Sequence, residues 1–179
     1  MAGRIFAALF VLLTVATPAL AQRENLQVFR DVQKQVLRYP HYTIFDSVNA
    51  EIDKGVVILT GKVTMPYKSS AIEKRVAKVE GVERVENRLE VLPVSQFDSE
   101  LRYRIARAIY SNPHFYGYLS RVNPPIHVIV ERGHVTLEGV VNNEVDRMLA
   151  RSIASSFISF ELKNELKTDA EVQEQLEKI

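Results

Sequence analysis

Two segments of the chain carry apolar residues at the spacing of an amphipathic helix. In the first, Phe29, Val32 and Val36 stand at i, i+3 and i+7. In the second, four apolar residues recur at i, i+4, i+7 and i+8, namely Leu101, Ile105, Ala108 and Ile109. This spacing places apolar side chains on one face of a helix. The pattern predicts two amphipathic helices, which end at Pro40 and Pro113 because proline cannot continue a helix.

Each predicted helix is followed by two runs in which apolar and polar residues alternate, as they do in a strand with one buried face. The first pair of runs carries Val48, Ala50 and Ile52, then Val57, Leu59, Gly61 and Val63. The second pair carries Ile126, Val128 and Val130, then Val135, Leu137, Gly139 and Val141. Between the runs, Gly55 and Gly133 stand where a tight hairpin turn needs a positive φ. Two β-hairpins are therefore expected.

A second helix is expected over about 66–79 and 143–157, and a third strand over 82–91 and 160–166. Each half then has the order helix, strand, strand, helix, strand. This order predicts an α+β fold of two tandem αββαβ modules, each a three-stranded mixed sheet covered on one face by two helices. Gly61 and Gly139 fall at inward strand positions, where we expect the missing side chain to let a helix pack closely.

The two halves also match in sequence, which indicates an internal duplication. The pattern G-x-V-x-L-x-G-x-V occupies residues 55–63 and recurs 78 residues later at 133–141. The pattern V-x-N-x-L at 85–89 returns as L-x-N-x-L at 162–166. We therefore predict a first module at 25–92 and a second at 97–167. Residues 168–179 begin with the helix-capping pattern Thr-x-x-Glu and form either a short final helix or a frayed tail.

The amino terminus has the pattern of a secretory signal peptide. Arg4 precedes an uncharged apolar run at 5–16, and Pro18 and Ala19-Leu20-Ala21 follow it. Such a charged start, short apolar run and small-residue end predict cleavage after Ala21. An uncleaved anchor and a buried helix are the alternatives. The chain contains no cysteine, so neither a disulfide nor the lipid anchor of a lipoprotein is available to it.

Charge and motifs restrict the function further. The chain carries 23 basic and 22 acidic residues, and Arg4 is the only charged residue of 1–21, so the mature chain is formally neutral. A neutral chain has no overall field that would draw it to nucleic acid. No H-E-x-x-H, G-x-S-x-G or phosphate-binding glycine loop is present. We expect no catalytic residue, metal or cofactor. His127 and His134 are expected to be solvated strand residues, and His41 and His114 to lie in loops.

These motifs resemble the BON domain family of bacterial envelope proteins. The first copy follows the family pattern through Gly81 to Val91, whereas the second has Ile158-Ser159-Phe160 near the place of that glycine. The resemblance covers 25–92 and 97–167. It implies a periplasmic protein linked to envelope integrity and osmotic stress, a domain thought to bind phospholipid, and no established catalytic residues.

The outer face of the first helix differs between the copies and supplies a candidate lipid site. In the first copy this face carries a mixture of charged and polar residues. In the second, arginines and aromatic residues gather on the helix and the loop after it: Arg102, Tyr103, Arg104, Arg107, Tyr110, Phe115, Tyr116 and Tyr118. Guanidinium groups pair with phosphate, and amphipathic rings favour a headgroup interface. The alternative is that these rings pack against the first module or an added helix.

The open sheet faces are the second candidate, because Val56, Ile58, Ile129 and Val140 point away from the helices. This half-apolar surface is suited to packing between the modules or to docking a protein. Two functions are therefore expected. The first is a non-enzymatic periplasmic module that binds an anionic phospholipid surface peripherally. The alternative is a module that docks on an envelope protein or associates with itself through the open sheet face. The sequence leaves the oligomeric state open.

Overall fold

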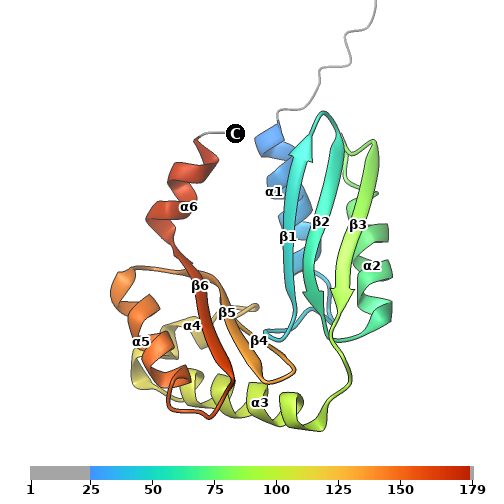
Figure 1. Cartoon of the computed structure of the whole chain (residues 1–179). Coiled ribbons are helices and arrows are strands. Elements are labelled where there is room, and N and C mark those ends of the chain that lie inside the picture. The colour runs from blue at the N-terminus through green and yellow to red at the C-terminus, as the bar shows by residue number, and fades with distance from the viewer. Residues whose placement is uncertain (1–24, 178–179) are drawn as a thin grey trace, which may run out of the picture.

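A computed structural model describes residues 25–177, so the predicted signal peptide lies outside the described residues. The first module contains α1 (Asn25–Leu37), β1 (Ser47–Asp53), β2 (Val56–Val63), α2 (Pro66–Val76) and β3 (Arg84–Val91). The second contains α3 (Gln96–Tyr110), the short helices η1 (Pro113–Phe115) and α4 (Tyr116–Leu119), β4 (Ile126–Glu131), β5 (His134–Val141), α5 (Glu144–Ala154) and β6 (Glu161–Thr168). A final helix, α6 (Asp169–Leu176), extends from β6 (Figure 1).

Each module has one three-stranded mixed sheet, which confirms the predicted fold class. In the first sheet β2 pairs antiparallel with β1 and parallel with β3, and the second sheet repeats this order with β4, β5 and β6. Helix α2 or α5 connects the two parallel strands. Both helices end about three residues earlier than expected, because the following residues continue in tighter i to i+3 hydrogen bonds, such as Val79 N to Val76 O.

Apolar faces of the helices and strands form one core in each module. In the first core, Val28, Val32 and Val36 of α1 pack over Val57 and Leu59 of β2. Val28 takes the buried position that the sequence pattern gave to Phe29, which is half-buried. The second core is larger because α3 packs against both β4 and α5. Among the described residues no helix combines the length and apolarity needed to cross a bilayer.

Two pairs of glycines shape the hairpins. Gly55 and Gly133 have φ of 81° and 78° at the turns, as expected. Gly61 and Gly139 also have positive φ, and an added Cβ would overlap a backbone carbonyl oxygen, that of Ser47 or of the residue before β4. The expectation that these two glycines make room for a helix is therefore wrong. They allow the backbone leading into the neighbouring strand to approach closely.

The modules meet through the loop after α1, residues 38–46, which reaches β4 of the second module (Figure 1). Ile44 and Phe45 pack against the second core, and Val128 N donates a 2.8 Å hydrogen bond to Ile44 O. The backbone carbonyl of Asp46 lies 2.6 Å from Nδ1 of His127. His127 is therefore buried at the joint, and the expectation of a solvated strand histidine is wrong.

The open sheet faces also take part in the joint. Lys62 of β2 pairs with Glu131 of β4, and Ser47 Oγ donates to Glu138 of β5 at 2.5 Å. Ile129, predicted on this face, is buried. Val56, Ile58 and Val140 remain half-exposed. Part of the predicted docking face is therefore occupied by packing between the modules.

Candidate functional site

Helix α3 carries most of the predicted site, and its first turn fixes its position. Ser95 caps the helix by accepting a hydrogen bond from Asp98 N. The carboxylate of the buried Asp98 accepts two further hydrogen bonds of 2.8 Å, from the backbone nitrogens of Arg132 and Gly133. The β4–β5 turn is thereby attached to the start of α3.

Arg102 was predicted on the exposed strip, and this is wrong, because its side chain is only 5% exposed overall. Its Nε donates to Asp98 O and its Nη2 to Val130 O, each at 3.2 Å. Burial lowers the pKa of this guanidinium, although the nearby Asp98 carboxylate opposes the shift. Arg102 is therefore a buried structural residue that joins α3 to β4, and its guanidinium is not accessible to a ligand.

Three aromatic residues of the predicted strip are also buried, which corrects their assignment to an exposed surface. Phe115 has no exposed surface. The hydroxyl of Tyr110 donates to Ile126 O at 2.7 Å and accepts from Ile126 N at 2.9 Å. The hydroxyl of Tyr118 donates to Asp146 at 2.5 Å, and burial raises its pKa to about 12. All three complete the second core.

The remaining four residues, Tyr103, Arg104, Arg107 and Tyr116, are exposed. Tyr103 is 63% exposed, yet its ring meets Phe45 of the first module edge-on with centroids 4.7 Å apart. The alternative of packing against the first module is thus realised in part for this ring. The Arg104 guanidinium lies over the Phe157 ring, 5.5 Å from its centroid. Half of the predicted strip therefore remains available to a ligand.

Four exposed apolar side chains of α5 and of the loop after it were not expected from the sequence. Val145 and Met148 lie on the outer surface of α5, and Ile158 and Phe160 lie in the loop from α5 to β6. Ile158 is 92% exposed and Phe160 is 82% exposed. The departure of the second copy from the family pattern at 158–160 was the available signal.

Two buried polar clusters were also missed. In the first module the Asp46 carboxylate accepts from Lys68 Nζ at 2.6 Å and from the backbone and hydroxyl of Thr64. Burial alone would raise the pKa of Asp46, but these hydrogen bonds outweigh it and hold the pKa below its usual value. Both charged side chains are buried, so the pair is a structural element beside the joint.

In the second module Asp146 is the buried carboxylate at the centre of the polar cluster. It accepts from Tyr118 and lies 2.6 Å from Nε2 of His114, which therefore does more than the loop residue that was expected. Burial would raise the pKa of Asp146, and the hydrogen bonds from Tyr118 and His114 lower it below its usual value. Neither buried cluster has a nucleophile beside a base in an open cavity.

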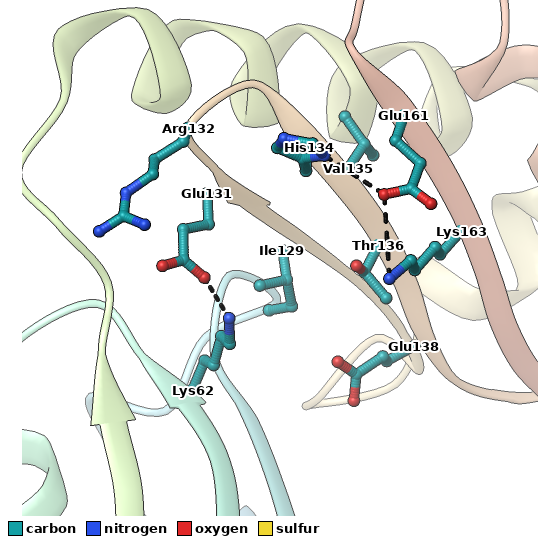
Figure 2. Close-up of a pocket in the computed structure, with 10 residues that line it drawn as sticks. All are labelled: Lys62, Ile129, Glu131, Arg132, His134, Val135, Thr136, Glu138, Glu161 and Lys163. Atoms are coloured by element: carbon teal, nitrogen blue, oxygen red, sulfur yellow. Dashed lines mark hydrogen bonds and ion pairs between the residues drawn. The ribbon is translucent and has the colours of Figure 1, made fainter.

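The open face of the second sheet is hollowed into a cavity of about 310 Å³, which Figure 2 shows. Ten residues line it: Lys62, Ile129, Glu131, Arg132, His134, Val135, Thr136, Glu138, Glu161 and Lys163. Nδ1 of His134 and Nζ of Lys163 lie 3.3 Å and 3.8 Å from the Glu161 carboxylate. Within residues 25–177 no three histidine or carboxylate side chains gather as a metal site would require.

A second hollow of about 650 Å³ lies along α1 of the first module. Arg30, Lys34 and Arg38 form its basic wall, and Val122 and Asn123 of the second module complete it. Asn123 donates a 2.7 Å hydrogen bond to Leu37 O at the end of α1. This hollow is the rival of the α3 surface for an anionic ligand, and it offers matched positions for a control.

Searches of curated proteins and of solved structures gave different results. No curated protein matches the chain. Two solved structures of CdsD, a structural protein of the type III secretion system of Chlamydia trachomatis, are similar to it. The first has 13% identity and a TM-score of 0.30, over 83% of this chain and 97% of that one. The second, of the C-terminal domain, has 12% identity and a TM-score of 0.28, over 81% and 98%.

The family comparison is more specific. The model of the BON domain matches residues 30–93 and again residues 98–170, which together are more than half of the chain. The two matched segments coincide with the two sheets and their helices. The chain therefore belongs to the BON domain family and contains two copies of the domain.

Proposed function

We propose that this protein is a non-enzymatic module of the bacterial envelope that docks peripherally on anionic phospholipid through the outer surface of α3. Membership in the BON family supports an envelope role without catalysis. In this proposal the chain is exported to the periplasm, the signal peptide is removed after Ala21, and the protein supports envelope integrity or tolerance of osmotic stress.

The exposed arginines of α3 carry the proposal. Arg104 and Arg107 stand one helical turn apart, and neither forms an ion pair with a carboxylate among residues 25–177. Tyr103 and Tyr116 are exposed beside them. Unpaired guanidinium groups bind phosphate bidentately, and tyrosine rings are stable at the boundary between headgroups and acyl chains. The surface therefore offers both kinds of contact that a peripheral membrane protein needs.

Vesicle binding tests this assignment. The mature protein is expected to sediment with vesicles that contain phosphatidylglycerol, and raised salt should weaken the binding because the contacts are largely electrostatic. The double variant Arg104→Ser/Arg107→Ser should lose most of the binding. The control Arg30→Ser/Lys34→Ser removes the same charge from α1 and should bind as the parent does. Equal losses in both variants would contradict the assignment to α3.

A second candidate function uses the open-face cavity to dock a protein. The cavity supports it because its lining presents charged groups of both signs around the buried Ile129. Such a mixed surface suits a polypeptide partner better than a phosphate headgroup. Crosslinking from Thr136, inside the cavity, would capture an envelope protein or a second copy if this candidate is right. Crosslinking to lipid from exposed positions of α3, with no protein captured from Thr136, would favour the lipid-binding function.

Export has a direct test of its own. The intact mass of the protein isolated from the producing cells should correspond to a chain that begins at Gln22. A full-length mass, or recovery only from the cytoplasmic fraction, would contradict the export proposal without bearing on the lipid site.

A further inference from the structure

The loop that connects α5 to β6, residues 155–160, differs in character from its counterpart in the first module. Glu83 N and Phe160 N donate equivalent hydrogen bonds to the carbonyls of Gly55 and Gly133. Phe160 therefore occupies the position that Glu83 has in the first module. The same offset pairs Ile158 with the exposed Gly81, and pairs Phe157 with the exposed Glu80. An acidic loop in one copy is an apolar loop in the other.

The apolar loop is held in place by its own hydrogen bonds. Ser156 N and Phe157 N donate to the carbonyls of Ile153 and Ala154, and Phe160 N donates to Gly133 O at 3.0 Å. The ring of Phe160 lies so close to the turn that an added Cβ on Gly133 would be 2.7 Å from it. A preformed loop loses little conformational entropy when it binds.

Despite this support, the two side chains at the tip of the loop remain largely exposed to solvent. Ile158 and Phe160 are 92% and 82% exposed, whereas Phe157 is half-buried in the second core. Exposed large apolar side chains beside one another mark an interaction site more often than isolated ones do. Because both side chains are exposed and line no hollow in Figure 2, the tip fits the apolar interior of a membrane better than a small ligand, which would need a concave site.

The charges around the loop indicate which partner its apolar tip fits. Arg104 of α3 lies over the ring of Phe157 at the base of the loop, which brings a guanidinium next to the apolar tip. The acidic residue that follows the loop, Glu161, pairs with His134 and Lys163 (Figure 2). The ring of His134 in turn lies 5.9 Å from that of Phe160, so the carboxylate beside the tip has cationic partners. An exposed apolar tip with a guanidinium at its base matches the surface of an anionic bilayer.

We propose that the 155–160 loop is a wedge that inserts Ile158 and Phe160 below the headgroups of an anionic bilayer, while Arg104 binds a phosphate above them. This inference rests on the proposed function and adds penetration to a contact that is otherwise electrostatic. Insertion of two side chains requires gaps between headgroups. Binding is therefore stronger to loosely packed, highly curved vesicles than to tightly packed flat ones.

The chain contains no tryptophan, so a single introduced tryptophan reports on its own surroundings. Ile158→Trp is the test variant and Glu80→Trp, in the corresponding loop of the first module, is the control. Both positions are exposed, so both variants are expected to fold. With vesicles of phosphatidylethanolamine and phosphatidylglycerol, Trp emission of Ile158→Trp should shift to the blue and be quenched by bromine atoms on the acyl chains. The control should show neither effect.

The outcomes separate the wedge from the proposed function. Vesicle binding without quenching of Ile158→Trp would overturn the wedge and leave the lipid-binding surface standing. Absence of vesicle binding would overturn both. A blue shift that grows with protein concentration in the absence of vesicles would show that a second copy covers the loop, and would also overturn the wedge. Ile158→Ser/Phe160→Ser should weaken vesicle binding by at least about tenfold, as expected from the lost apolar burial.

Discussion

The two modules share a fold but place opposite charges at the same buried position. Lys68 and Asp146 are each the third residue of the helix that connects the parallel strands. Lys68 is unfavourable at a helix N-terminus and is held there by Asp46, which also closes the joint between modules. Asp146 is favourable there and organises the loop of its own module through His114 and Tyr118. The duplicated position thus holds a buried ion pair beside the joint in one copy and organises a local loop in the other.

The helix-covered outer surfaces differ just as clearly. Arg104 and Arg107 of α3 correspond in sequence to Asp31 and Lys34 of α1, so two basic residues in the second copy replace an acidic and a basic residue in the first. The loop after α5 is apolar where the loop after α2 is acidic. The comparison shows that the core pattern was retained in both copies while the outer surface diverged. We therefore expect binding and stability to respond differently to matched changes in the two modules.

The largest expected effect is on the buried pair of the first module. Asp46→Ala leaves the Lys68 ammonium buried without a partner, and this should lower the free energy of unfolding by about 3–5 kcal/mol. Urea denaturation measures the change. Asp46→Ala/Lys68→Met removes both charges and should recover a large part of the loss. A loss below about 1 kcal/mol in the single variant would show that the pair contributes little to the stability of the first module.

The next largest effect is a difference in stability between substitutions of two neighbouring arginines of α3. Arg102→Ala removes hydrogen bonds to two buried carbonyls and should cost about 2–3 kcal/mol of stability. Arg104→Ala, two residues along the helix, should change stability by less than about 0.5 kcal/mol because its side chain is exposed. The same denaturation curves measure both. Equal costs would contradict the division of the strip into structural and available residues.

The second module should show a smaller, pH-dependent effect. The pKa of Asp146 lies below its usual value in the folded state, so the folded chain binds fewer protons there than the unfolded chain does. Its contribution is therefore present above the unfolded pKa of about 3.9 and is lost as pH falls through the folded pKa. Asp146→Asn should cost about 1–2 kcal/mol near neutral pH. The difference between parent and variant should shrink below pH ~4, and a constant difference would contradict the assignment.

Much of this fold is predictable from residue patterns, because the regularly spaced apolar residues of each module are buried within that module. Val32 and Val36, and the alternation through Val57 and Leu59, identify the elements and their inward faces. The turn glycines follow from the same reasoning. The role of Gly61 was not predictable, because the backbone that approaches it belongs to a neighbouring strand whose bend has no simple sequence signature.

The candidate site was harder to predict because burial there depends on two neighbours at once. Helical periodicity assigns one buried face to α3. The helix packs on β4 and on α5, and Arg102 and Tyr110 add hydrogen bonds to backbone carbonyls of β4, so the buried face extends to both. His127 is buried by the loop of the other module, which no pattern within its own module reveals. Ile158 and Phe160 were visible only as a departure from the repeat.

The central claim is that the second module, and not the first, binds anionic phospholipid. The most direct measurement is the binding of phosphatidylglycerol vesicles by two charge-matched variants, Arg104→Ser/Arg107→Ser and Arg30→Ser/Lys34→Ser, at low and raised salt. The first variant is expected to lose most of the salt-sensitive binding, and the second is expected to keep it. Retained binding in the first variant together with loss in the second would contradict the claim, and would place the site in the basic hollow along α1.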